Sequence, residues 1–222
     1  MAADKQASPT SERLDFYARL RFMRLEQPKA FDSGGKPRWE ATFILDPSDA
    51  KGQAGIDLIL KAAAKIGKET YGTVPLAIKK LAAKFVAGAP KVDLNDPKNA
   101  DDNIKIAFID GDTKAEYSGY AGMFIVPAHN SKLRPSVANR KGLAVQPGEP
   151  QYPYDGAYGI GRITLWAQVG QTLKLYGKRI GVNLRGVQFA NDGAPFTQDT
   201  ADEDFTPLAE DATETTSSSD FD

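Results

Sequence analysis

Alternating hydrophobic and polar positions predict a strand over residues 15–25 (DFYARLRFMRL). A period of two is typical of a half-buried strand, because successive side chains point to opposite faces. The apolar row expected to face a core is Phe16, Ala18, Leu20 and Phe22. The row expected to face solvent is Tyr17, Arg19 and Arg21. A Gly- and Pro-rich turn follows, so residues 38–45 (RWEATFIL) predict the second strand of a hairpin.

The hydrophobic period changes to that of a helix between residues 47 and 86. Asp46 or Ser48 is suited to cap the start of a first helix, and Gly72 is suited to end it. The apolar residues at helical spacing are Ile56, Ile59, Leu60, Ala63 and Ile66. A second, shorter helix is expected from Pro75 onwards, because Pro is favoured in the first helical turn. Residues 47–86 therefore predict a helical insertion.

Strand patterns return in the second half of the chain, at residues 104–110, 121–128, 134–142, 162–169 and 173–189. Short strands joined by Gly- and Pro-rich segments favour a small barrel or sandwich over a parallel, doubly wound sheet. We therefore predict a mainly β fold with a helical insertion, in which residues 1–190 form an OB-fold-like small barrel. Residues 191–222 hold few large apolar side chains to offset the entropy of ordering, so they predict a disordered acidic C-terminal tail.

The charges of the chain are separated along its length. Beyond Arg185 there is no Lys or Arg, while ten Asp and Glu residues lie in that stretch. All 28 basic residues therefore fall within residues 1–185, together with 19 acidic ones, which leaves that part with a net charge of +9. A cationic body attached to an anionic tail points to a polyanionic partner for the body and a separate role for the tail.

Cations and aromatic rings share the polar rows of several predicted strands. Binding single-stranded nucleic acid without sequence choice requires cations that follow the phosphates and rings that stack on the bases. The residues predicted to bind single-stranded DNA are Tyr17, Arg19, Arg21, Arg134, Arg140, Lys141, Tyr152, Tyr154, Tyr158, Arg162, Trp166, Arg179 and Arg185. A purely structural role stays open for each one, because arginines are common on strand surfaces, Trp166 can pack under a loop, and the loop tyrosines can anchor their loop.

The C-terminal end carries a second candidate motif. The last three residues, Asp220, Phe221 and Asp222, place a ring among acids. We expect Phe221 to fill an apolar pocket on a protein partner, and the acids of the tail to compete with DNA for the cationic body. The alternative is a tail that acts only as a solubilising linker.

The stretch 158–196 resembles a family of phage-encoded single-stranded DNA-binding proteins with an OB fold and an acidic C-terminal tail. The resemblance rests on a Gly-flanked strand, an aromatic-bearing strand and a Gly-containing segment, followed by Leu184, Val187, Gln188, Asp192 and Gly193. It implies a protein that coats transient single strands during phage DNA replication or recombination, and a tail that recruits replication or recombination proteins. One departure is Asp222, which follows Phe221 where such tails commonly end on the phenylalanine.

Other classes of function fit the sequence less well. The absence of Cys and the single histidine, His129, argue against thiolate or His metal sites and against Ser–His or Cys–His catalysis. We expect no enzyme activity, no cofactor and no metal site. Two alternatives stay open, namely a magnesium-dependent nuclease and a phage structural or protein-interaction module that binds no nucleic acid. The acids available to the nuclease are Asp101, Asp102, Asp110 and Asp112.

The hydropathy of the chain bears on its location. No stretch approaches the roughly 18–20 unbroken apolar residues of a membrane span. The N-terminal residues lack the apolar region of a signal peptide. We therefore expect no membrane association and a cytoplasmic protein, in the host cell if the chain is phage-encoded.

Overall fold

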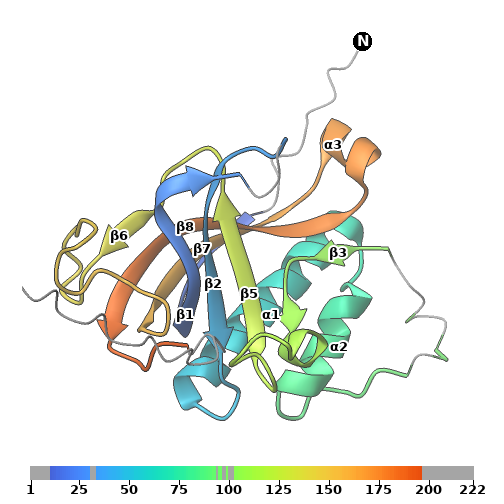
Figure 1. The fold of residues 1–222 in the computed structure, drawn as a ribbon. Coiled ribbons are helices and arrows are strands. Elements are labelled where there is room, and N and C mark those ends of the chain that lie inside the picture. The colour runs from blue at the N-terminus through green and yellow to red at the C-terminus, as the bar shows by residue number, and fades with distance from the viewer. Residues whose placement is uncertain (1–10, 31–33, 94, 97–98, 100–102, 197–222) are drawn as a thin grey trace, which may run out of the picture.

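The computed structural model describes residues 11–30, 34–93, 95–96, 99 and 103–196. Figure 1 shows the arrangement of its helices and strands. The strands are β1 (Ser11–Lys29), β2 (Arg38–Leu45), β3 (Lys105–Ile106), β4 (Ile109–Asp110), β5 (Phe124–Asn130), β6 (Ser136–Ala138), β7 (Tyr158–Ala167) and β8 (Arg179–Asn191). The helices are α1 (Ala50–Tyr71), α2 (Leu76–Phe85) and α3 (Gly170–Tyr176), with a short 3₁₀ helix at Gly111–Lys114.

Five of the strands close into a barrel in the order β1-β2-β5-β8-β7, with β7 returning to β1. The neighbours run antiparallel except β5 and β8, which meet in parallel where His129 lies opposite Asn183. Figure 1 shows β2 and β5 crossing in front of β7 and β8. Closure leaves no barrel strand with an unpaired edge. Five strands closed in this way, mostly antiparallel, define an OB-like barrel. The predicted fold class is confirmed.

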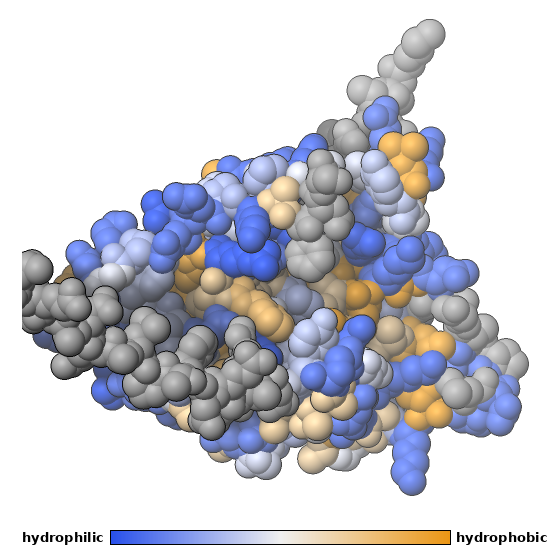
Figure 2. All heavy atoms as spheres, viewed as in Figure 1, coloured by the Kyte–Doolittle hydropathy of each residue, from blue (hydrophilic) through white to orange (hydrophobic). Residues whose placement is uncertain are grey.

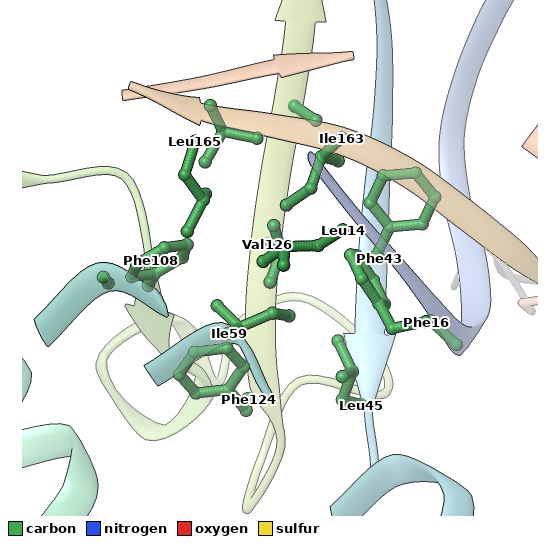
Figure 3. Close-up of a cluster of buried hydrophobic side chains, with 14 of the residues drawn as sticks. Leu14, Phe16, Phe43, Leu45, Ile59, Phe108, Phe124, Val126, Ile163 and Leu165 are labelled. Atoms are coloured by element: carbon green, nitrogen blue, oxygen red, sulfur yellow. The ribbon is translucent and has the colours of Figure 1, made fainter. Parts of the chain in front are cut away.

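The apolar rows of the barrel strands meet in one core, of which Figure 3 shows the centre. Phe16 of β1 packs edge-on against Phe43 of β2, with ring centroids 5.3 Å apart. Burial alternates along the whole of β7, as the period of two predicts. Ile59 of α1 enters the same cluster, and Phe124 of β5 contacts the ring of Phe85 at the end of α2. The two helices therefore extend the barrel core.

The predicted helical insertion corresponds to α1 and α2, which occupy the connection between β2 and β5. The predicted cap, Asp46 or Ser48, is wrong. Asp49 caps α1, because its carboxylate accepts a hydrogen bond of 2.9 Å from the amide of Gly52, while the Asp46 carboxylate accepts from the amide and the hydroxyl of Ser48. Gly72 ends the helix in the left-handed conformation, with φ of 76°. Within the part of the chain that the structure describes, no helix is both long and apolar enough to cross a membrane.

Two further local predictions are wrong. Residues 173–176, predicted as part of a strand, belong to α3, which has a glycine with positive φ at each end, Gly170 at 67° and Gly177 at 76°. These two reversals interrupt the extended chain between β7 and β8. Phe22, predicted to face the core, has φ of 51° and is 38% exposed. The register between β1 and β2 shifts between Arg21 and Arg24, so a bulge turns the Phe22 ring outwards.

Candidate nucleic-acid interface

The outward row of β1 carries three of the predicted binding residues, Tyr17, Arg19 and Arg21. We call their surface, together with the aromatic rings that contact them, the β1 face. Hydrophobic and hydrophilic residues both reach the surface on the side of the barrel shown in Figure 2. Among the described residues, neither Arg19 nor Arg21 forms an ion pair with a carboxylate. Their positive charge therefore remains available to an anionic ligand.

The bulge at Phe22 is held by a single acidic side chain from a distant loop. The carboxylate of Asp155 accepts hydrogen bonds from the amides of Phe22 and Met23, at 2.9 and 2.8 Å. The displaced Phe22 ring packs edge-on against Tyr117, with centroids 5.8 Å apart. Tyr117 is 41% exposed. Two large rings thus stay open to solvent at a backbone position that costs free energy to maintain, which is typical of a functional site.

Arg21 lies among aromatic rings. Its guanidinium carbon is 4.8 Å from the centre of the Phe22 ring, 5.5 Å from that of Tyr120 and 4.4 Å from that of Phe196. One of its terminal nitrogens is buried and makes no hydrogen bond to any described residue. Burial raises the pKa of the Tyr120 hydroxyl, although the hydrogen bond with Thr42 and the charge of Arg21 act in the opposite direction. Tyr120 therefore stays neutral at physiological pH, and Arg21 keeps an unsatisfied donor.

Phe196 also lies over Arg19, so one ring covers both arginines. The Arg19 guanidinium carbon is 4.0 Å from the centre of the Phe196 ring. Arg19 donates a hydrogen bond of 2.6 Å to the carbonyl of Ala194 and one of 3.3 Å to that of Gly156. The chain that follows β8 therefore runs back across the outward row of β1.

A stacked pair of tyrosines continues this surface towards β7. The rings of Tyr17 and Tyr158 are nearly parallel, 7° apart in orientation and 5.7 Å between centroids. The ammonium of Lys51, at the start of α1, lies 4.8 Å from the centre of the Tyr17 ring. Both tyrosines and Arg19 line a pocket of about 360 Å³. The pocket combines two ring surfaces and one arginine with the carboxylates of Asp46 and Asp49, so it suits a base better than a phosphate.

The outer face of β7 and β8 carries three further predicted binding residues, and each has a partner within the protein. Trp166 packs against Gly181, where an added Cβ would come within 2.4 Å of the indole ring, and its buried indole nitrogen makes no hydrogen bond to any described residue. Arg162 binds Asp15 at 2.7 Å, and this hydrogen bond lowers the pKa of the Asp15 carboxyl. Arg185 donates to the hydroxyl of Thr164 at 2.9 Å. We call this surface the β7–β8 face.

The other predicted residues lie outside the outward row of β1. The structure places Arg134, Arg140 and Lys141 in the exposed segments that flank β6. In the loop before β7, burial raises the pKa of Tyr152, and the Tyr154 hydroxyl donates to Asp192 at 3.0 Å. Arg179 is exposed at the start of β8. The motif Asp220, Phe221 and Asp222 lies outside the described residues.

Sequence reasoning missed the rings of Phe22, Tyr117, Tyr120 and Phe196. The alternation assigned Phe22 to the core, and only the bulge reverses it. Tyr117, which is exposed, and Tyr120, which is buried, belong to a Gly-containing loop (EYSGYAG), whose composition is the one available signal of a functional loop. Phe196 falls within the predicted tail, so its contact with two arginines could be found only from the fold.

Two of the four acids assigned to the alternative of a nuclease, Asp110 and Asp112, bind a lysine. The Lys84 ammonium contacts the carboxylates of Asp110 and Asp112, each at 2.6 Å. A hydrogen bond from Lys84 lowers the pKa of Asp112. In the described part of the chain no group of three His, Cys, Asp or Glu side chains is arranged to hold a metal ion. Asp101 and Asp102 lie outside the described residues.

A closed OB-like barrel with unpaired arginines and open aromatic rings on one face defines a protein of the class that binds unpaired nucleic acid strands. The family described as "Enterobacter phage Enc34, ssDNA-binding protein" matches residues 15–217. Protein p50 of Acyrthosiphon pisum secondary endosymbiont phage 1 is 32% identical over 186 residues, which cover 81% of this chain and 83% of that protein. The chain therefore belongs to this family of phage single-stranded DNA-binding proteins, which are binding proteins and not enzymes.

Solved structures agree on the fold. The single-stranded DNA-binding protein of bacteriophage Enc34, solved in complex with ssDNA, is similar to 88% of this chain and to all of that chain. The TM-score is 0.59 and the sequence identity 22%. A C-terminal truncation of the same phage protein is similar over 83% of this chain and 88% of its own, with a TM-score of 0.56 and 23% identity. This chain thus shares its fold with the bacteriophage Enc34 protein.

Proposed function

We propose that this protein binds single-stranded DNA on the β1 face, without sequence choice, and thereby coats and protects transient single strands during phage DNA replication or recombination. The family supports the ligand. The β1 face supports the location, because there the arginines lack acidic partners and the rings of Phe22 and Tyr117 are open to solvent. The site of action is the cytoplasm of the host cell.

Each group on the β1 face has a distinct task in this proposal. The guanidinium groups of Arg19 and Arg21 bind phosphates or stack flat on bases, as Arg does in single-strand sites. The rings of Phe22 and Tyr117 stack one base, and the pocket beside Tyr17 and Tyr158 receives another. The observation that carries the proposal is the outward turn of Phe22 beside Arg21. Exposing this ring to water costs free energy that burial in the core would avoid, so its position is explained by a ligand that covers it.

The start of the C-terminal segment competes with DNA in this proposal. Phe196 lies on the two guanidinium groups with which a base would stack, so a bound strand displaces it. The acids that follow raise the local concentration of negative charge beside the same arginines. The protein therefore exchanges an internal ring for a base when it binds.

The test is a competition experiment with the full chain. A labelled deoxyoligonucleotide is bound at two salt concentrations, and unlabelled single-stranded DNA, RNA and duplex DNA compete with it. We expect single-stranded DNA to compete much better than duplex, and affinity to fall with salt at a logarithmic slope of about −0.7 per phosphate contact. Absence of binding at low salt would overturn the proposal and favour an interaction module.

The end of the tail has a separate role in this proposal. We assign Asp220, Phe221 and Asp222 to the recruitment of replication or recombination proteins, because the acids suit a basic rim and the ring suits an apolar pocket. Replacing Phe221 by Ala is expected to abolish capture of such a partner and to leave the binding of DNA unchanged. Capture that is insensitive to Phe221→Ala would remove this role.

A further inference from the structure

An apolar groove of about 520 Å³ lies between α1 and α2, away from the residues of the β1 face. Leu60 and Ile78 form its buried floor. Half-buried side chains form its walls, namely Ala64, Val74, Ala82 and Val86. Figure 1 shows α1 and α2 packed side by side, and in Figure 2 hydrophobic residues interrupt the hydrophilic surface in the region of α2.

Positive charges surround the groove. Lys61 and Lys91 are exposed at its rim, and Lys79 lies there with its ammonium 2.8 Å from the side-chain oxygen of Asn99. Among the described residues that line the groove, the one acid is Asp57, whose carboxylate accepts a hydrogen bond from Gln53 at 2.8 Å. An apolar floor within a cationic rim fits a peptide that presents hydrophobic side chains among acids.

We propose that the groove binds residues 202–211 of the same chain, whose sequence is DEDFTPLAED. This segment carries five acids and no base, and its large apolar side chains, Phe205 and Leu208, are three positions apart. Phe205 and Leu208 fill the groove between α1 and α2, and the flanking acids lie against Lys61, Lys79 and Lys91. The inference concerns a surface other than the one proposed for DNA, and it stands or falls separately.

The length of chain that joins the two parts is sufficient. The Phe196 ring lies beside Gly119, where an added Cβ would come within 2.6 Å of it. Gly119 and Gly52, in the first turn of α1, line the same pocket. From Gly52 to Lys61 the helix advances about 13 Å, at 1.5 Å per residue. The nine residues from Phe196 to Phe205 span up to about 30 Å when extended. About 17 Å of this reach remain for the path from Phe196 to the first turn of α1, so the proposed docking leaves Phe196 in place.

The test is zero-length carbodiimide crosslinking of the full chain in dilute solution without DNA, followed by peptide mass spectrometry. We expect bonds within one chain between the lysines of the groove rim and the acids of 202–211. The double substitution Phe205→Ala and Leu208→Ala is expected to reduce these crosslinks at least fivefold, because the acids alone have no apolar anchor. Phe221→Ala, the same kind of change in the same acidic segment, is the matched control and leaves them unchanged.

Three outcomes would overturn the proposal. Lys65 is exposed on α1 outside the groove rim and pairs with Glu12 at 3.7 Å, so its crosslinks measure nonspecific charge attraction to the tail. Equal crosslinking of Lys65 and Lys61 would overturn the proposal. Crosslinks that survive the Phe205 and Leu208 substitutions would overturn it as well. Crosslinks found only between two chains would show that the groove binds a second copy of the protein and not the tail of the same chain. Ala82→Glu, which closes the groove from its wall, adds an independent variant, and the tail substitutions decide the question if that variant fails to fold.

Discussion

The β1 face and the β7–β8 face are built from the same kinds of residue, yet they differ in what those residues bind. On the β7–β8 face Arg162 pairs with Asp15, and Trp166 lies on Gly181. On the β1 face Arg21 forms no ion pair with a carboxylate of the described residues, and Phe22 is turned out of the core by a bulge. The comparison teaches that availability for a ligand depends on internal partners, which a pattern of alternating residues does not reveal.

The same comparison assigns different roles to side chains that the sequence treats as equal. An arginine already bound to a carboxylate must give up a charged partner before it can bind a phosphate. Arg21 need only release the Phe196 ring. Arg19 releases that ring together with hydrogen bonds to the neutral carbonyls of Ala194 and Gly156. We therefore expect substitutions on the β1 face to change DNA affinity, and substitutions on the β7–β8 face to change mainly stability.

The largest effect is expected from replacing both Arg19 and Arg21 by Ala. Two charge-assisted contacts worth about 1.5–3 kcal/mol each are lost, so affinity for single-stranded DNA falls about 100-fold or more. The logarithmic salt slope becomes shallower by about 1.4, for two phosphates at about 0.7 each. Fluorescence anisotropy at several salt concentrations measures both quantities. The matched control replaces Arg162 and Arg185 by Ala, and an equal loss in that variant would move the interface to the β7–β8 face.

The next effect in size is expected from Phe22→Ala. Removing a ring that stacks on a base costs about 1–3 kcal/mol of binding, or about tenfold in affinity. Because the Phe22 ring is exposed and outside the core, the melting temperature should change little. Trp166→Ala is the control with the opposite pattern, a lower melting temperature and nearly unchanged affinity of the folded protein. A loss of binding in Trp166→Ala without loss of stability would contradict the distinction between the two faces.

A smaller effect, of opposite sign, is expected from Phe196→Ala. Two cation–π contacts worth about 0.5–1 kcal/mol each no longer compete with the bases, so affinity should rise about fivefold at low salt. Binding titrations of the full chain measure the change, with Phe221→Ala as the control. Unchanged or weaker binding would show that Phe196 supports the interface and does not compete for it.

The smallest effect concerns Asp15 and Arg162. Their hydrogen bond lowers the pKa of Asp15 in the folded protein, so the pair stabilises the fold above the unfolded pKa of about 3.9, and this contribution is lost as the pH falls through the lowered value. Both side chains are 41% exposed, which limits the contribution to below about 1 kcal/mol. The melting temperature of Asp15→Asn should therefore lie slightly below that of the wild type at pH 7, and the gap should close at acidic pH. A gap independent of pH would exclude this ion pair as its cause.

The sequence predicted the fold well wherever a regular period decides the structure. The alternation along residues 158–167 appears directly in the burial of β7, and the helical spacing from Ile56 to Ile66 places these side chains in the core. The prediction failed at α3 and at Phe22, where single backbone positions with positive φ reverse the chain or its side chains. Such positions depend on contacts with distant residues, such as Asp155 at the bulge, and periodicity carries no information about them.

The sequence predicts which kinds of residue form the candidate site, and where on the barrel DNA binds stays a prediction. Alternation correctly assigned Tyr17, Arg19 and Arg21 to the outer surface of β1. It assigned Arg162 and Trp166 to the outside of β7 as well, but the residues that bind them, Asp15 and Gly181, become neighbours only when the barrel closes. The contact of Phe196 with β1 joins positions 175 or more residues apart, which exceeds anything a local pattern can indicate.

The contact of Phe196 with Arg19 and Arg21 has a thermodynamic consequence for any protein that binds the segment after Phe196. The protein then has two forms, one with Phe196 on the arginines and one with Phe196 released. In the proposed function a nucleic acid strand binds the released form, and a protein that binds the released segment favours the same form. Linkage is reciprocal, so a partner that favours the released form strengthens strand binding by the same factor by which the strand strengthens the partner. Through this one aromatic residue, a partner protein would bind the DNA-bound form more tightly than the DNA-free form.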